Sequence, residues 1–272
     1  VAESWETADN KKFVFHLRED AKWSNGDPVT ADDFVYSFQR AVDPATASPY
    51  SWYMEYTKMV NAKDIIAGKK DKSELGVKAV DAHTLEIQLD TAVPYFVMMM
   101  GHTTVKPVHQ ATVEKFGDKW TKPGNFVGNG AFVVNSWVVN ERLELLRNEQ
   151  YWDNKDTKLD KVTYLPIENP VAEMNRFLSG EISFTSTLPT EHFKRLKKEN
   201  PESVSVEGSL CTYYYSFNTQ KKPFDDVRVR KAISYAIDRD IVSGAILGQG
   251  QKPAYFLTPE ITAGFNPELP AY

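Results

Sequence analysis

The chain has 272 residues, a length that allows one large domain or two of ordinary size. Its 32 Lys and Arg against 37 Asp and Glu give a net charge of −5, which argues against nucleic acid as a partner, because phosphate binding needs clustered positive charge. Hydrophobic residues make up 42% and aromatic residues 12%, which argues against disorder, and no apolar stretch approaches the roughly 20 residues of a membrane helix.

The first part of the chain predicts a strand, a turn and an amphipathic helix. The strand covers 13–17, and Asn-Gly at 25–26 marks the turn. Thr30 is the expected N-cap of the helix, which ends at Asp43-Pro44 because the residue before proline is disfavoured in a helix.

Short elements are expected next. The aromatic-rich segment 44–61 predicts a loop or short helix. Apolar and polar residues alternate over 85–89, which is typical of a half-buried strand. An apolar helix is expected from Pro94 to Met100, ended by Gly101, and a charged helix over 111–116.

From residue 124 the pattern favours strands. Segments 131–134 and 143–146 predict a hairpin, and 162–165 a further strand. Three more strands are expected over 182–185, 204–206 and 211–217.

Helices are expected over 171–178, 191–198, 227–237 and 241–247. The last six residues predict a loop. Strands and helices alternate irregularly and without an internal repeat, so the sequence predicts an α/β architecture of more than one lobe.

Catalytic and metal-binding signals are weak. The chain lacks a Gly-x-Ser-x-Gly elbow, a His-Glu-x-x-His pair and a phosphate-binding loop. The paired aspartates at 32–33 and 225–226 stand at helix starts, where carboxylates complement the helix dipole. We therefore predict no enzyme, no metal site and no cofactor.

One cysteine, Cys211, has no partner within the chain for a disulfide. Two interpretations are open. It is a buried thiol, as free cysteines usually are, or its partner is missing from the chain.

Aromatic residues carry the binding signal. Tyr213, Tyr214 and Tyr215 are consecutive in an expected strand, so they alternate between two faces, of which one suits a core and the other a ligand wall. The segment from Tyr50 to Tyr56 offers the same two choices. His102 follows an apolar helix and either caps its C-terminus as a cation or donates to an anionic ligand.

Several blocks, in order along the chain, resemble the peptide-binding proteins of ABC importers, solute-binding protein family 5. They are AKWSNGDPVTA at 21–31, GNGAF at 128–132, RNEQYWD at 147–153, SGEI at 179–182, FNTQ at 217–220, RVRKAI at 228–233 and AIDR at 236–239. Each block is moderately specific, and their common order makes the resemblance strong.

The resemblance implies a type II periplasmic-binding-protein fold: α/β, two-lobed and hinged, with mixed sheets, and incomplete in this chain. It implies an accessory lobe at 1–108, part of the first main lobe at 109–210 and the start of a truncated second main lobe at 211–272. The chain would be an internal fragment that binds peptide poorly alone, and Cys211 would pair with a cysteine beyond Tyr272.

The resemblance also implies a function and a site. The protein would be periplasmic and monomeric, and it would capture short peptides for an ABC transporter permease. Tyr50 matches a pocket tyrosine, and His102 a histidine near the C-terminal end of the ligand. Residues 213–216 match a ligand-contacting strand, in which Ser216 replaces a glutamate of the oligopeptide binders.

Three alternatives remain open. The family includes a murein-tripeptide binder, which has a small residue at the position of Ser216. A hydrolase acting on peptides would need a converging acid and base. A chaperone or signalling role would use the same groove as transport.

Overall fold

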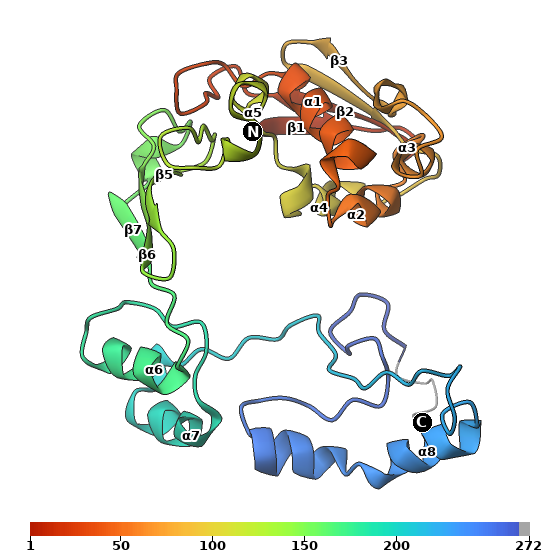
Figure 1. The fold of residues 1–272 in the computed structure, drawn as a ribbon, viewed down its shortest axis with the longest axis vertical. Coiled ribbons are helices and arrows are strands. Elements are labelled where there is room, and N and C mark those ends of the chain that lie inside the picture. The colour runs from red at the N-terminus through yellow and green to blue at the C-terminus, as the bar shows by residue number, and fades with distance from the viewer. Residues whose placement is uncertain (267–272) are drawn as a thin grey trace. The chain divides into compact units, whose positions relative to one another are not determined.

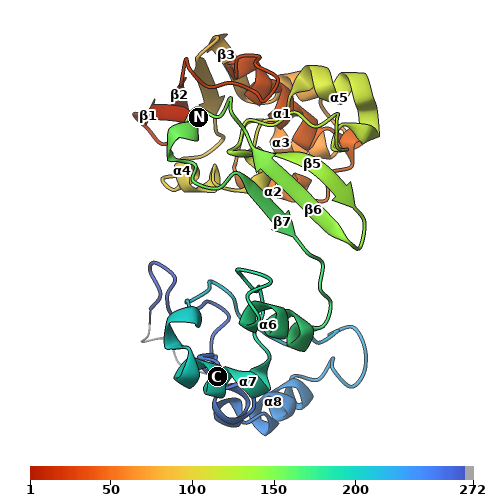
Figure 2. The same ribbon diagram turned by 90° about the vertical axis from the view of Figure 1, so that its left-hand side faces the viewer.

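The structure is a computed structural model, and it describes residues 1–266 (Figures 1 and 2). The chain forms two compact units, Val1–Pro166 and a second one from Ile167 onward. The loop expected at 267–272 lies outside the described residues. The three lobes expected at 1–108, 109–210 and 211–272 stay a prediction.

A four-stranded antiparallel sheet carries the core of the first unit. It contains β1 (Ala2–Glu6), β2 (Lys12–Leu17), β3 (Val77–Asp81) and β4 (Thr84–Gln88), in the order β1-β2-β4-β3. The strands expected at 13–17 and 85–89 are confirmed. The sequence did not predict β1 and β3, because β1 is exposed throughout and β3 has one buried residue, so neither shows an apolar period.

Helix α1 (Ala31–Val42) covers one face of this sheet, and its predicted bounds are confirmed (Figure 1). The Asp33 carboxylate accepts hydrogen bonds from the Thr30 backbone N–H (2.8 Å) and from the buried Trp23 indole N–H (3.1 Å). The first turn of α1 is thereby fixed to the preceding loop. Phe38 and Val42 on the inner face are buried.

Short helices and 3-10 turns make up much of the rest of the first unit. They are α2 (Ser51–Tyr56), α3 (Ala62–Ile66), α4 (Phe96–Met99) and α5 (Gln110–Phe116), with 3-10 turns η1 (Pro44–Thr46), η2 (Lys72–Glu74), η3 (Thr103–Val105), η4 (Gly117–Lys119) and η5 (Asn154–Asp156). The helix expected from Pro94 is shorter than predicted, because Tyr95 serves as its N-cap and Met100 as its C-cap.

Aromatic and aliphatic side chains from the sheet and these helices form one core. Phe96 of α4 packs against Phe13 and Phe15 of β2, with ring centroids 4.8 and 6.4 Å apart. Ile87 and Leu89 from β4 and its end complete the centre of the core. This packing fixes α2 and α4 as rigid supports for the side chains they expose.

A second, three-stranded sheet contains β5 (Phe132–Val138), β6 (Arg142–Arg147) and β7 (Lys161–Tyr164), in that order (Figure 2). The hairpin and the third strand are confirmed. We expected mixed sheets, whereas both sheets of the described residues are purely antiparallel. Short turns join β1 to β2, β3 to β4 and β5 to β6, and a short turn permits only antiparallel pairing.

The second unit is built from helices and irregular segments. It contains α6 (Pro170–Leu178), α7 (Thr190–Glu199), the 3-10 turn η6 (Pro201–Ser203), α8 (Val227–Ala236) and a π-helix, η7 (Ile241–Leu247). The four predicted helices are confirmed in position.

Three predicted strands are wrong for the described residues. Segments 182–185, 204–206 and 211–217 have no strand structure, because none of them pairs with another strand there. Cys211 is exposed, so the buried thiol that we considered is wrong as well.

Within residues 1–266, no helix combines the length and apolar composition that crossing a bilayer requires.

Candidate functional site

An aromatic surface lies on α2 of the first unit and the turn beside it. We define it as Tyr50, Trp52, Tyr53, Tyr56 and His102. Their rings contact one another in sequence: Trp52 lies 5.9 Å from Tyr50 and 5.5 Å from Tyr56, measured between ring centroids. Tyr50, Trp52 and Tyr56 are about half exposed (48%, 48% and 59%), so this surface presents ring faces and hydroxyls to solvent.

The two predicted site residues of this unit, Tyr50 and His102, lie side by side. The His102 ring stacks on Tyr53 at 3.9 Å and lies 5.6 Å from Tyr50. Burial raises the pKa of the Tyr53 phenol, which donates to the Met99 carbonyl at 2.8 Å and so ties α2 to α4. The sequence analysis missed Tyr53, although it lies within the aromatic segment that was singled out.

The hydrogen bond of His102 tests one of its two predicted roles, the cationic cap of the preceding helix. Its Nδ1 accepts from the Thr104 backbone N–H at 3.2 Å, at the start of η3. The ring therefore caps the turn that follows it, and the expected cation at the C-terminus of α4 is wrong. A neutral imidazole with an accepting Nδ1 carries its proton on Nε2, which makes Nε2–H a donor.

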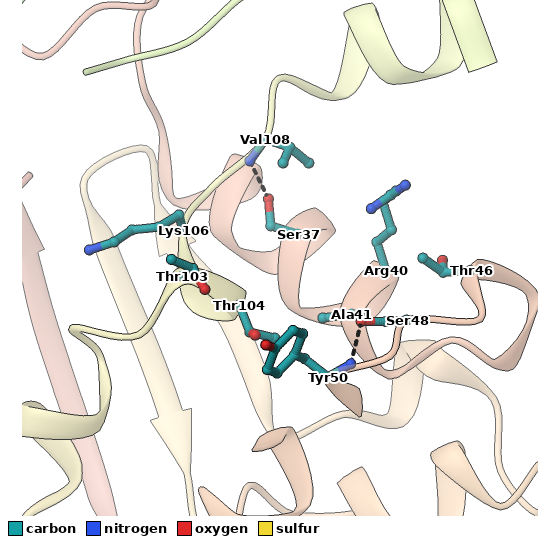
Figure 3. A pocket seen from close by; sticks show the side chains of 10 residues that line it. All are labelled: Ser37, Arg40, Ala41, Thr46, Ser48, Tyr50, Thr103, Thr104, Lys106 and Val108. Atoms are coloured by element: carbon teal, nitrogen blue, oxygen red, sulfur yellow. Dashed lines mark hydrogen bonds between the residues drawn. The ribbon is translucent and has the colours of Figure 1, made fainter. Parts of the chain in front are cut away.

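A pocket of about 270 Å³ adjoins Tyr50 (Figure 3). The end of α1, the turn before α2 and the segment after His102 form its walls. It is lined by Ser37, Arg40, Ala41, Thr46, Ser48, Tyr50, Thr103, Thr104, Lys106 and Val108. The sequence analysis missed Arg40 and Lys106, because nothing in the local pattern brings these distant positions together.

The remaining candidates lie in the second unit. Tyr213, Tyr214 and Tyr215 are 85%, 63% and 70% exposed, and Ser216 is exposed too. The rings of Tyr213 and Tyr215 meet at 5.8 Å, as side chains two residues apart do in an extended segment. We expected one face of this segment to be core, but all three rings face solvent in the described structure.

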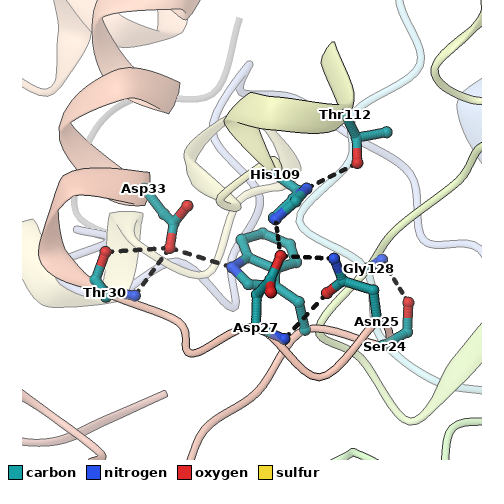
Figure 4. Close-up of polar contacts among 9 residues, drawn as sticks. Ser24, Asn25, Asp27, Thr30, Asp33, His109, Thr112 and Gly128 are labelled. Carbon is teal, nitrogen blue, oxygen red and sulfur yellow. Dashed lines mark hydrogen bonds and ion pairs between the residues drawn. The ribbon is translucent and has the colours of Figure 1, made fainter. Parts of the chain in front are cut away.

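A buried histidine tests the hydrolase alternative (Figure 4). His109 Nε2 lies 3.0 Å from the Asp27 carboxylate, and Nδ1 lies 2.7 Å from the Thr112 hydroxyl. These three hydrogen-bonded side chains, Thr112, His109 and Asp27, are of the residue types that serve as nucleophile, base and orienting carboxylate in a catalytic triad. Thr112 is only 5% exposed, so a substrate has no access to its hydroxyl. The network instead ties α5 to the loop that contains Asp27.

Metal chemistry has no support in this part of the chain. Among residues 1–266, no three His, Cys, Asp or Glu side chains are grouped so as to hold a metal ion. What the geometry offers is a wall of rings, hydroxyls and one imidazole donor, which suits recognition of a ligand.

The chain belongs to the bacterial extracellular solute-binding proteins, family 5. Residues 1–272 match the middle region that defines this family. The family predicted from the sequence blocks is therefore confirmed.

Particular relatives are close. The chain is 56% identical over 265 residues to the periplasmic oligopeptide-binding protein OppA of Salmonella typhimurium, a match that covers 97% of this chain and 49% of that protein. The murein tripeptide binding protein MppA of Escherichia coli superposes with a TM-score of 0.94 at 50% identity, over 98% of this chain and 52% of that one.

A third relative was solved with a peptide. OppA of Haemophilus influenzae in complex with RPPGFSPFR superposes with a TM-score of 0.89 at 48% identity, over 95% of this chain and 51% of that one. These likenesses confirm the predicted fold class, an α/β fold of the periplasmic-binding-protein type. The chain spans about half the length of the curated relatives it matches.

Proposed function

We propose that this chain is part of a periplasmic solute-binding protein that captures short peptides and delivers them to an ABC transporter permease. The observation that carries the proposal is the 56% identity to an oligopeptide-binding protein over nearly the whole chain. A peptide complex of another relative on the same fold supports it. We expect the protein to act as a monomer, without a cofactor and without enzymatic activity.

We further propose Tyr50, His102, Tyr213, Tyr214, Tyr215 and Ser216 as ligand contacts. Importing peptides of varied sequence requires recognition of what all peptides share, which is their backbone. Among the described residues, the backbone N–H and C=O groups of 211–217 have no backbone hydrogen-bond partner. An extended peptide pairs with such a segment as an added strand, while exposed tyrosine rings contact side chains of different size.

The first experiment identifies the natural ligand. The full-length protein is purified gently, washed and denatured, and the released small molecules are analysed by mass spectrometry. We expect a heterogeneous set of short peptides. A second preparation, denatured, washed free of ligand and refolded, is the control, and it must release nothing until peptides are added back.

Murein tripeptide is the second candidate ligand, because the chain superposes on its binding protein with a TM-score of 0.94. Release of a single species containing diaminopimelate would support it over general peptide capture. If no peptide is released and the refolded protein binds none of the added peptides, the proposed function is wrong.

A further inference from the structure

Asparagine followed by glycine occurs twice in the chain, at Asn25-Gly26 and at Asn129-Gly130. This dipeptide is chemically fragile, because glycine has no Cβ to keep its backbone nitrogen away from the side chain before it. The nitrogen can then attack Cγ of the asparagine amide. Both places have the same reacting groups, so their surroundings decide which of them reacts.

Three hydrogen bonds hold Asn25 and Gly26 in place. The Asn25 Nδ2 donates to the Asp27 carboxylate at 2.6 Å, and its Oδ1 accepts from the Asp27 N–H at 3.2 Å (Figure 4). The attacking atom is engaged as well, since the Gly26 N–H donates to the Trp23 carbonyl at 2.8 Å. Attack on Cγ has to turn the amide away from Asp27 and free the Gly26 N–H, so this turn protects Asn25.

Asn129 and Gly130 have no such restraint. Within residues 1–266, neither the side-chain amide of Asn129 nor the N–H of Gly130 forms a hydrogen bond with another protein group. Asn129 is partly exposed and Gly130 is exposed, so water reaches the dipeptide. Exposure alone would favour reaction at Asn25, the more exposed of the two asparagines. The hydrogen bonds favour Asn129 instead.

The residues on both sides of Asn129 are anchored. The Gly128 carbonyl accepts from the Ser24 N–H at 2.9 Å, and the Gly128 N–H donates to the Ser24 hydroxyl at 3.3 Å (Figure 4). The Gly130 carbonyl accepts from the side-chain amide of Asn148 at 2.8 Å, and Asn148 is only 3% exposed. A backbone lengthened between these two anchors would therefore have to displace one of them.

We propose that Asn129 is a site of spontaneous deamidation and isomerisation. The Gly130 nitrogen loses its proton and bonds to Cγ, while the Cγ–Nδ2 bond breaks and Nδ2 leaves with a proton as ammonia. The resulting succinimide ring takes up one water molecule, and opening at either carbonyl gives aspartate or isoaspartate. No oxidant or reductant takes part, and water is the only co-reactant.

The isoaspartate product alters the backbone itself. Its chain runs through the former side chain, which adds one methylene between Gly128 and Gly130, whereas the aspartate product keeps the normal backbone. Both products replace a neutral amide by a carboxylate. We expect isomerisation to loosen the anchored turn, whatever ligand the protein binds.

Mass spectrometry of the full-length protein tests the choice of site. The protein is stored in warm, mildly alkaline buffer and digested, and fragment spectra follow the mass gain of each asparagine as NH2 is replaced by OH. We expect Asn129 to react about tenfold faster than Asn25, or more, because at Asn25 hydrogen bonds of ordinary strength must first be broken. Reaction at Asn25 as fast as at Asn129 would overturn the proposal.

A denatured sample separates structure from sequence. In urea the hydrogen bonds around Asn25 are lost, so the two asparagines should react at similar rates. If Asn129 keeps the same advantage in urea, the folded structure is not its cause and the proposal is wrong.

Gly130→Ala provides a matched variant. A Cβ at this position meets no atom within 4 Å, so the fold accommodates it, and circular dichroism spectra should match those of wild type. The added methyl group hinders attack by the backbone nitrogen. We expect it to suppress the reaction of Asn129 and to leave that of Asn25 unchanged; an unchanged rate at Asn129 would contradict the attack by Gly130.

The effect on the turn is measured by comparing two carboxylates. The isoaspartate form of the stored protein is separated by ion exchange, identified by labelling with an isoaspartate methyltransferase, and compared with Asn129→Asp, which has the same charge on a normal backbone. We expect the isoaspartate form to unfold at a lower urea concentration, followed by tryptophan fluorescence. Equal midpoints would show that the anchored turn accepts the extra methylene, and the proposed loosening would be wrong.

Discussion

Asp33 shows how one carboxylate stabilises several neighbours. It accepts from the backbone N–H of Thr30 (2.8 Å), from the Thr30 hydroxyl (3.3 Å) and from the indole N–H of Trp23 (3.1 Å). Trp23 is 1% exposed, so its N–H has no access to water once this acceptor is lost. The helix start and the buried indole therefore depend on the same side chain.

We expect Asp33→Ala to lower the free energy of unfolding by about 2–3 kcal/mol, because it removes the carboxylate that completes the capping box of α1 and leaves a buried donor unsatisfied. Its neighbour Asp32 is a matched control in the same first turn, with an exposed side chain. Asp32→Ala is expected to cost about 0.5 kcal/mol. All six tryptophans lie in the first unit, so urea unfolding followed by tryptophan fluorescence reports the unfolding of the unit that contains Asp33. An equal loss of unfolding free energy in both variants would contradict the stabilising role given to the Asp33 hydrogen bonds.

At the scale of elements, an ion pair ties the end of α1 to η2. Lys72 Nζ lies 2.6 Å from the Asp43 carboxylate, which also accepts from the Ala45 N–H at the start of η1. The hydrogen bond from Lys72, and then that from Ala45, lowers the pKa of Asp43 below its usual 3.8. The same contact raises the pKa of Lys72 above its usual 10.5.

The sign of the pH dependence follows from these shifts. A carboxylate whose pKa is lower in the folded state stabilises the fold above its unfolded pKa, and this stabilisation is lost as pH falls through the folded pKa. Asp43→Asn keeps a side chain that caps helices but removes the charge. We expect it to cost about 1 kcal/mol or less at pH 6, since Lys72 is half exposed.

The difference between wild type and Asp43→Asn should shrink towards zero as the pH is lowered from 6 to well below 3.8, because a protonated Asp43 resembles asparagine. Urea midpoints at a series of pH values, read from tryptophan fluorescence, measure this. Asp118→Asn, at an exposed carboxylate in η4, should show no such change. A difference that stays constant down to pH 2 would rule out the ion pair as its source.

Elements with a local signal were predicted well from the sequence. Helix α1 has a cap and an apolar stripe of its own, and the alternating residues of β4 mark its buried face. The segment 211–217 has strand-like composition, but a strand also needs a partner, and no local pattern shows whether one exists. For the same reason, resemblance predicted Tyr50 and His102 singly, whereas the pocket beside Tyr50, which Arg40 and Lys106 help to line, required the folded chain.

At the scale of the whole molecule, the two units differ in how much apolar surface they bury. The first unit contains the main core, from Phe13 to Val105. Of the large apolar residues in the second unit, Met174, Phe193 and Leu196 are buried. Many others are more than a third exposed: Leu178, Phe184, Val206, Leu210, Val227, Ile233, Tyr235, Ile241, Val242, Ile246, Leu247, Leu257 and Ile261.

This contrast predicts unequal local stability in the 272-residue chain. Since buried apolar area is the main source of stability, opening the second unit should cost less free energy than opening the first. We expect amide hydrogens of α8 to exchange about tenfold faster or more, relative to their intrinsic rates, than those of β2 and β4. Hydrogen exchange read by mass spectrometry on peptides from each segment measures this directly.

Tyrosine and tryptophan fluorescence give an independent check. The second unit has no tryptophan, so its unfolding should precede the change in tryptophan fluorescence. Equal protection of α8 and β2, with coincident fluorescence transitions, would mean that the exposed side chains of the second unit do not limit its stability.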